Sequence, residues 1–215
     1  MPAVSLVIAD DHPVVLQGLI ALLREHSNFK LVGSCSNGLD CINTIRNLLP
    51  DVALLDINMP NANGLDVLKM VTAEGLPTRI IFLAASPSDR EIMAAVEGGA
   101  FGIMLKESAP DMLVNCLQAV AGGHKWLPPS LVDPALERAR QTRAQFERVD
   151  NALTEREREV MLLVVDGLSN KEVARRLNIS EGTVKVFLHS IYQKVSVNNR
   201  TALAKFASLY RDRMR

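Results

Sequence analysis

Residues 52–66, VALLDINMPNANGLD, combine the features that decide the fold of the N-terminal half. The run VALLD (52–56) is apolar without alternation, which is typical of a strand buried on both faces of a parallel sheet. It ends in Asp56, and a loop that contains Asn, Pro and Gly follows it. A helical pattern then runs from Leu65 to Glu74. This stretch therefore predicts one strand–loop–helix unit of an α/β fold.

The same alternation of strand and helix recurs along the first half of the chain. Four more apolar runs lack period-two alternation: SLVIA (5–9), KLVGSC (30–35), IIFLA (80–84) and GIMLK (102–106). Helical patterns occupy residues 14–25, 39–48, 89–97 and 110–121. Strands that alternate with helices are joined by right-handed crossovers. The sequence thus predicts a doubly wound, five-stranded parallel sheet with helices on both faces.

Length and charge indicate two domains. A chain of 215 residues, 48% of them hydrophobic, is long enough for two cores. Residues 1–128 carry 8 Lys and Arg against 13 Asp and Glu, whereas residues 129–215 carry 16 against 11. An acidic half before a basic half suggests an acidic site and a module for a polyanion, although ordinary surface variation could also produce this difference. We place an acidic domain at 1–125, a linker at 126–150 and a basic domain at 151–215.

The cysteines and the N-terminus indicate the cellular compartment. Cys35, Cys41 and Cys116 are scattered without a CxxC spacing, so neither a disulfide framework nor a zinc site is indicated. The N-terminal residues lack the basic segment of a signal peptide, and no apolar stretch approaches the ~20 residues that span a bilayer. We expect a cytoplasmic protein that does not associate with membranes.

Charged residues stand where several predicted strands end. The first strand is followed by Asp10 and Asp11, the third ends in Asp56 and the fifth in Lys106. A single Asp at a strand end is usually a turn or cap residue, and a single Lys is usually solvated. Their coincidence at one sheet edge instead favours a site where carboxylates bind Mg²⁺, Asp56 acts as a nucleophile towards a phosphoryl group and Lys106 offsets its charge.

Three motifs at these strand ends resemble the receiver domain of bacterial two-component response regulators. They are IADDHP (8–13), LLDINMPNANGLD (54–66) and GAFGIMLKES (99–108), and the resemblance covers about residues 3–122. It implies a flavodoxin-like fold. It also implies a sensor histidine kinase as the partner that donates the phosphoryl group.

The resemblance assigns roles within the acidic site. It implies that Asp56 is the phosphoacceptor and that Lys106 contacts the phosphoryl group. It implies that Mg²⁺ is bound by Asp10, Asp11, Asp56 and the main-chain carbonyl of Asn58.

Two positions depart from the receiver pattern. Receivers place Thr or Ser at the end of the fourth strand and an aromatic residue in the fifth, and here these positions are Ala84 and Ile103. Ser86 lies two residues beyond Ala84, and it is either a substitute hydroxyl or an ordinary turn residue. We therefore expect phosphorylation to be retained while its coupling to conformation is weakened or rerouted.

The C-terminal segment predicts a compact bundle of short helices. Thr154 to Glu157 and Ser169 to Glu172 both fit the capping box, and Ser180 begins a third helix. In the helix 181–195, Val184, Leu188, Ile191 and Val195 recur on one face, which leaves Lys185, Val186, His189 and Gln193 on the other. On such a face, Lys can bond guanine and Val can contact a thymine methyl in the major groove.

Residues 153–207 resemble the LuxR-type helix-turn-helix, and the two domains together resemble the NarL/FixJ class of response regulators. The resemblance implies base contacts from Lys185, Val186 and His189. The candidate phosphate contacts are Lys171, Thr183 and Arg200. For each of them the alternative interpretation is a solvated surface residue that does not contact DNA. Specific binding of double-stranded DNA generally needs a homodimer on two half-sites, and in this class the last helix, here 198–213, often pairs.

These observations predict a bacterial transcription regulator, and not an enzyme, in which phosphorylation of Asp56 controls DNA binding. A regulator of the same architecture that works without phosphorylation is one alternative, supported by Ala84 and Ile103. A metal-dependent phosphohydrolase with Asp56 as nucleophile is another, although position 58 is Asn where a second acid would be needed.

Overall fold

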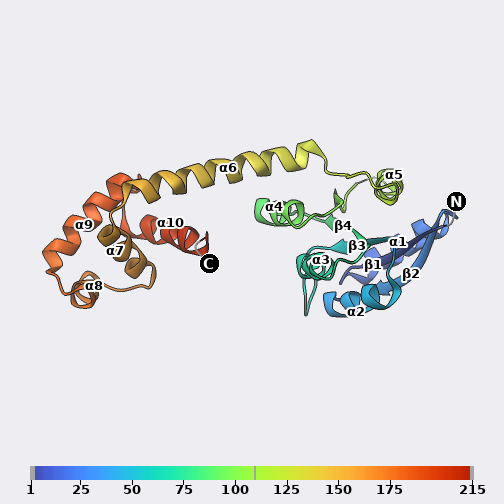
Figure 1. Ribbon diagram of the computed structural model, residues 1–215, viewed down its shortest axis with the longest axis horizontal. Coiled ribbons are helices and arrows are strands. Elements are labelled where there is room, and N and C mark those ends of the chain that lie inside the picture. The colour runs from blue at the N-terminus through green and yellow to red at the C-terminus, as the bar shows by residue number, and fades with distance from the viewer. Residues whose placement is uncertain (1–2, 109, 214–215) are drawn as a thin grey trace. The chain divides into compact units, whose positions relative to one another are not determined.

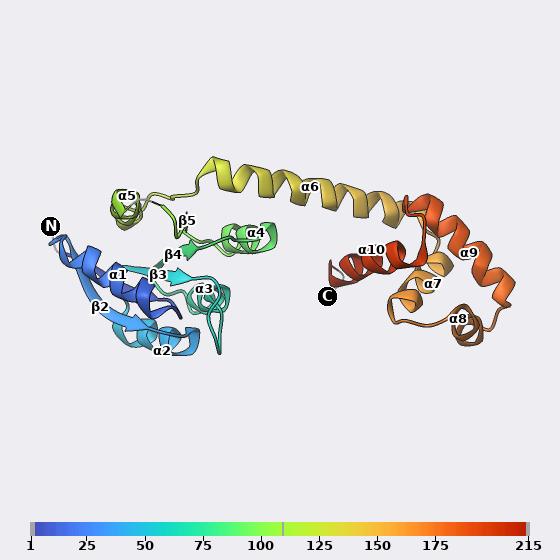
Figure 2. The same ribbon diagram turned by 180° about the vertical axis from the view of Figure 1, so that it is seen from behind.

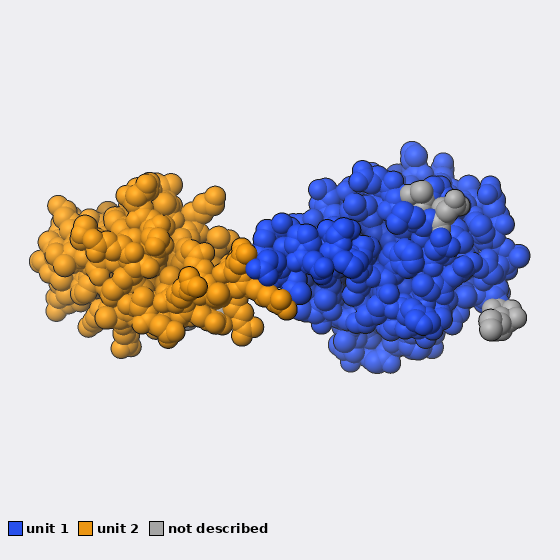
Figure 3. Space-filling view, turned by 90° about the horizontal axis from the view of Figure 1, so that it is seen from above, with its two compact units in different colours: residues 1–139 blue, residues 140–215 orange. Residues whose placement is uncertain are grey.

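The computed structural model describes residues 3–108 and 110–213. The chain divides into two compact units, residues 1–139 and residues 140–215 (Figure 3). Each unit has a hydrophobic core of its own. The segment 126–150 that the sequence predicts as a linker is shared between the two units.

The first unit is built on a five-stranded sheet whose strands pair in parallel in the order β2-β1-β3-β4-β5 (Figure 1). The strands are β1 (Val4–Ala9), β2 (Phe29–Cys35), β3 (Val52–Asp56), β4 (Arg79–Ala84) and β5 (Gly102–Leu105). The connecting helices are α1 (Pro13–Arg24), α2 (Gly38–Leu48), α3 (Gly64–Ala73), α4 (Asp89–Glu97) and α5 (Pro110–Ala121). The predicted doubly wound parallel sheet is confirmed, with strand and helix ends within one residue of those expected.

The sheet is buried on both faces, which explains the unalternating strands. All five residues of β3 are buried. One core packs the sheet against α2, α3 and α4, and the other packs it against α1 and α5. These helices can be followed from behind in Figure 2. The winding reverses between β1 and β3, and this is the point where a doubly wound sheet binds ligands at the carboxyl ends of its strands.

Residues 126–139 belong to the first unit by their contacts. Trp126 donates its backbone N–H to the carbonyl of Phe101 at 2.7 Å, and its own carbonyl accepts from Ile103 N at 3.0 Å, beside β5. The helix α6 (Pro129–Ala152) then places Ala135, fully buried, in the core that also contains Ile92 of α4. Arg138 reaches both carboxylate oxygens of Asp89 on α4, at 2.5 and 2.6 Å.

The substitution Ala135→Asp should release the start of α6 from α4, because burying an unpaired carboxylate costs several kcal/mol. We expect trypsin to cleave after Arg138 and Arg140 at least about tenfold faster, since cleavage follows the population of the opened form. Mass spectrometry of the fragments measures this rate, and Trp126 fluorescence shows that the sheet stays folded. Ala144→Asp, at an exposed position of α6, is the control. Equal rates in both variants would contradict the packing role of Ala135.

The second unit is helical. Its helices are α7 (Glu155–Val165), α8 (Asn170–Leu177), α9 (Glu181–Lys194) and α10 (Arg200–Arg213), joined by the end of α6. The capping boxes predicted at Thr154 and Ser169 are both formed. Phe146 and Val149 of α6 pack into the core of this unit. None of the helices in the described part of the chain has both the length and the hydrophobicity needed to cross a lipid bilayer.

Candidate functional site: an acidic pocket and a recognition helix

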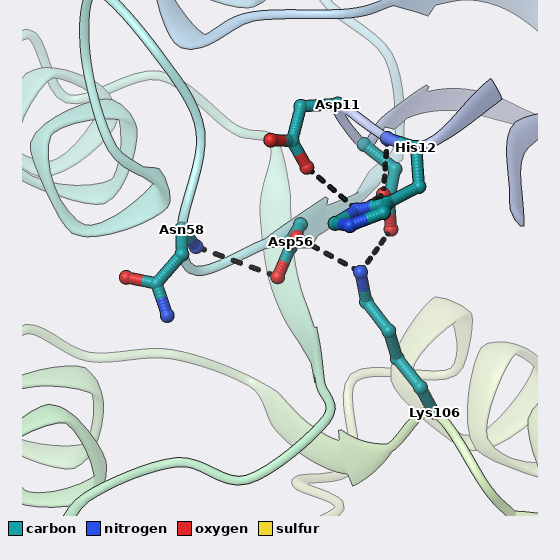
Figure 4. Close-up of polar contacts among 6 residues, drawn as sticks. Asp11, His12, Asp56, Asn58 and Lys106 are labelled. Atoms are coloured by element: carbon teal, nitrogen blue, oxygen red, sulfur yellow. Dashed lines mark hydrogen bonds and ion pairs between the residues drawn. The ribbon is translucent and has the colours of Figure 1, made fainter.

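The acidic pocket lies at the carboxyl edge of the sheet. Asp56 is the last residue of β3, Asp10 follows β1 and Lys106 follows β5. Parallel pairing of neighbouring strands brings these ends to one edge, with Ala9 opposite Leu55. The structure therefore brings together the residues that the sequence proposes for this site (Figure 4).

Lys106 joins two buried carboxylates. Its ammonium nitrogen lies 2.6 Å from Asp10 Oδ2 and 2.8 Å from Asp56 Oδ2 (Figure 4). Asp10 is 1% exposed and Asp56 is 5% exposed. Burial alone would lower the pKa of Lys106, but the hydrogen bonds to Asp10 and Asp56 outweigh it and raise the pKa. Lys106 therefore stays charged and offsets part of the negative charge.

His12 also belongs to this pocket. Its Nδ1 lies 2.7 Å from Asp11 Oδ1 and 3.1 Å from Asp10 Oδ1, and its backbone N–H donates to Asp10 Oδ1 at 2.9 Å. Ligand atoms of Asp10, Asp11, His12 and Asp56 all lie within 4.8 Å of one another. Carboxylate oxygens are the ligands that Mg²⁺ prefers, so the donor set fits that ion. Sequence reasoning missed His12, although its place directly after Asp11 was a visible signal.

The loop after Asp56 runs beside the carboxylates. Asn58 is exposed, and its backbone N–H is 3.4 Å from Asp56 Oδ1, which is long for a hydrogen bond. Gly64 begins α3 so close to β3 that a Cβ there would lie 2.4 Å from the carbonyl oxygen of Asp56. Only glycine permits this approach. Gly64 thus positions the strand end that carries Asp56, a role that the sequence alone did not indicate.

In the second unit, α9 has two distinct faces. Val184, Leu188 and Ile191 are buried in the core. Lys185, Val186, His189 and Gln193 are exposed, and Val186 is 68% exposed. Val186 thus presents an apolar side chain between the polar side chains of Lys185 and His189. This outer face is suited to contact base edges in a major groove.

Glu157 holds α9 against α7. It is 4% exposed, and it accepts hydrogen bonds from Ser190 Oγ at 2.6 Å and from Lys194 Nζ at 2.7 Å. It also caps α7 through the backbone N–H and the hydroxyl of Thr154. Burial would raise the pKa of Glu157, but the hydrogen bonds from Lys194, Ser190 and Thr154 outweigh it and lower the pKa to about 2. The rotation of α9 that exposes its outer face is therefore fixed by a buried carboxylate.

The three candidate phosphate contacts have different surroundings. Lys171 is exposed in the first turn of α8. Thr183 is half-buried at the start of α9, with its hydroxyl 2.8 Å from Ser180 Oγ. Arg200 is half-buried, and it donates to Asn170 Oδ1 at 2.9 Å and to the carbonyl of Leu168. Much of the Arg200 guanidinium is thus engaged in joining α10 to the start of α8.

Family comparisons assign both units. The model of the response regulator receiver domain matches residues 6–118. The chain belongs to the response regulators. Residues 151–207 of this regulator match the model of bacterial regulatory proteins of the luxR family. The resemblances stated from the sequence are confirmed for both units.

Relatives of this regulator match it along nearly its whole length. It is 37% identical over 203 residues to the nitrate/nitrite response regulator protein NarL of Escherichia coli, with 94% of each chain covered. It is 33% identical to the transcriptional regulatory protein LnrK of Bacillus subtilis, with 96% of this chain and 97% of the relative covered. The structure of the Salmonella typhimurium RcsB response regulator is similar over 95% of this chain and 99% of that one, with a TM-score of 0.69 and 29% identity.

The regulator lacks the usual switch side chains at two buried positions. Ala84 ends β4 and is 2% exposed, and its carbonyl accepts from Lys106 N at 2.8 Å. Ile103 of β5 is fully buried. Ser86 is exposed beyond the end of β4. Ala84 has no hydroxyl that could bond a phosphoryl group. Ile103 has no aromatic ring that could change its rotamer in response.

Proposed function

We propose that this response regulator accepts a phosphoryl group on Asp56 and controls transcription by binding double-stranded DNA through α9. The observation that carries the proposal is the pairing of one lysine, Lys106, with two buried carboxylates at the edge of the sheet. A structural ion pair needs only one carboxylate for one lysine. A pocket with surplus carboxylate is instead prepared for further cations and for a charged substrate.

The chemistry follows from the residues of the pocket. An Asp56 carboxylate oxygen attacks the phosphorus of a phosphohistidine on the sensor kinase, so a P–O bond forms as the P–N bond breaks and the histidine leaves. Lys106 offsets the charge on the transferred group. We propose that Asp10, Asp11, Asp56 and the main-chain carbonyl of Asn58 hold Mg²⁺, which supplies further charge stabilisation when bound. The acyl phosphate forms in a 1:1 reaction, so the proposed role is that of a regulator and not of an enzyme.

The output side of the proposal is sequence-specific DNA binding. We propose that Lys185, Val186 and His189 contact bases and that α10 helps to form a homodimer on two half-sites. The proposed phosphate contacts are Lys171, Thr183 and Arg200. A solved complex of the RcsB regulator with DNA supports this proposal, because it matches 96% of this chain at a TM-score of 0.59. Three free cysteines support a place in the reducing cytoplasm.

A second candidate function is regulation without phosphorylation. The buried Ala84 and Ile103 favour it, because they cannot convert a phosphoryl group into a rearranged hydrogen bond. In that case protein contacts or a small ligand would bias the first unit. Both candidates keep DNA binding through α9.

The experiment measures DNA affinity of wild type and Asp56→Asn, with and without acetyl phosphate and Mg²⁺, over a range of salt concentrations. Duplexes selected from a random library by the full-length protein serve as DNA. We expect phosphate incorporation, seen by intact mass, only in wild type, with an affinity gain of about tenfold or less because the switch residues are missing. Incorporation without any change in affinity would support the second candidate. Incorporation in Asp56→Asn would contradict the assignment of the phosphoacceptor, and turnover of p-nitrophenyl phosphate would favour a phosphohydrolase.

A further inference from the structure

Gln193 and His189 form a pair on the outer face of α9. They are one helical turn apart, both are exposed, and their Nε2 atoms lie 3.2 Å apart. The outer face of α9 also carries Lys185 and Val186. Sequence reasoning assigned a base contact to His189 and none to Gln193.

The chemistry of this contact fixes what each side chain can still bond. An amide nitrogen can only donate, so the imidazole Nε2 of His189 accepts in this contact. The distal nitrogen of His189 is therefore already used. The Gln193 amide retains its oxygen and its second N–H, which form one acceptor beside one donor.

The position of Gln193 brings this free edge towards the middle of the outer face. Side chains on a helix lean back towards its N-terminus, so Gln193 covers the turn that carries His189. A neighbouring acceptor and donor match the adenine edge in the major groove, where N6 donates and N7 accepts. Lysine offers donors only, and valine offers neither a donor nor an acceptor.

We infer that Gln193 is a specificity-determining residue of the recognition helix, with its amide bonded to an adenine and held in place by His189. The inference rests on the proposed entry of the outer face of α9 into the major groove. In this arrangement His189 positions Gln193 instead of making the base contact proposed for it above. If the contact only stabilised the helix surface, its loss would leave base preference unchanged at every position.

The test is base preference at every position of the binding site. Full-length wild type and the variants Gln193→Ala, Gln193→Glu and His189→Ala select duplexes from one random library, and sequencing gives the preferences. Gln145→Ala, an exposed glutamine on α6, is the matched control. We expect wild type to prefer adenine about tenfold at one position of each half-site, and Gln193→Ala to lose that preference alone. Gln193→Glu should shift it to cytosine, whose amino group donates to a carboxylate. His189→Ala should weaken it.

Each contrary outcome can be told apart. Unchanged preferences in Gln193→Ala would overturn the inference and leave DNA binding through α9 intact. An equal loss of base preference at all positions in Gln193→Ala would show that Gln193 acts only on the structure of the helix. That outcome also overturns the inference. If wild type selects no duplex above background, the proposed function itself is wrong.

Discussion

Replacing Glu157 by Ala should lower the free energy of unfolding of the second unit by about 3 kcal/mol at neutral pH. The substitution removes the cap of α7 and the acceptor for Ser190 and Lys194 at the same time. Its buried site is left without the carboxylate that satisfies those donors. Urea unfolding followed by far-UV circular dichroism measures the loss, while fluorescence of Trp126, the one tryptophan of the chain, reports the first unit separately.

The pH dependence of this effect has a definite sign. Because the folded-state pKa of Glu157 is lowered to about 2 from an ordinary value near 4.5, its stabilisation is present above pH 4.5. It is lost as the pH falls from about 4.5 towards 2, as the unfolded state takes up the proton first. The difference in the free energy of unfolding between wild type and Glu157→Gln should therefore shrink as the pH falls over that range.

Glu172→Ala is the matched control for Glu157→Ala. Glu172 occupies the same capping-box position in α8, but it is exposed and its hydrogen bonds are made within its own cap. The Glu172→Ala substitution should lower the free energy of unfolding by less than Glu157→Ala does, and it should leave α9 in place. An equal loss in both variants would show that the contacts from Ser190 and Lys194 add nothing.

The fold of the first unit was predictable because its signals are local. A strand such as VALLD needs only a few residues to show that both faces are buried. The meeting of Asp10, Asp56 and Lys106 was predictable as well. Parallel strands end at one edge, so the topology alone brings those residues together.

The contacts that sequence reasoning missed join residues far apart in the chain. The TERE pattern predicted that Glu157 caps α7, but its contacts with Ser190 and Lys194 span 33 and 37 residues. They depend on how α9 crosses α7, which no local pattern encodes. The ion pair between Arg138 and Asp89 is also a contact between residues far apart in the chain. It joins α6 to α4, and its Arg138 lies in the segment predicted as a linker.

The surroundings of individual surface cations were not predictable from the sequence. Lys171 and Arg200 look alike in the sequence, and both were assigned to DNA phosphates. In the structure Lys171 is exposed, whereas Arg200 donates to the carbonyl of Leu168 and to Asn170. Whether an arginine faces solvent or satisfies a loop carbonyl depends on neighbours that only the tertiary fold provides.

Replacing Lys106 by Met should lower the free energy of unfolding of the first unit by about 3 kcal/mol in the absence of divalent cations. Asp10 and Asp56 are both buried, and the substitution leaves their carboxylates without the ammonium that lies between them. Two like charges at short range then repel each other in a poorly solvated pocket. Met has a similar length and apolar stem, so packing should change little. Unfolding in urea followed by Trp126 fluorescence measures the loss.

Added Mg²⁺ distinguishes the charge effect from a packing defect. If carboxylate repulsion is the cause, millimolar Mg²⁺ should restore more stability to Lys106→Met than it adds to wild type, because the variant pocket carries one more uncompensated charge. Lys69→Met is the control, since Lys69 is 75% exposed and pairs with the half-buried Asp66 on its own helix. Its stability should stay within about 0.5 kcal/mol of wild type with or without Mg²⁺. A loss in Lys106→Met that Mg²⁺ does not reduce would mean that Lys106 acts through packing, and the surplus of carboxylate that supports the proposed phosphoryl site would lose its energetic basis.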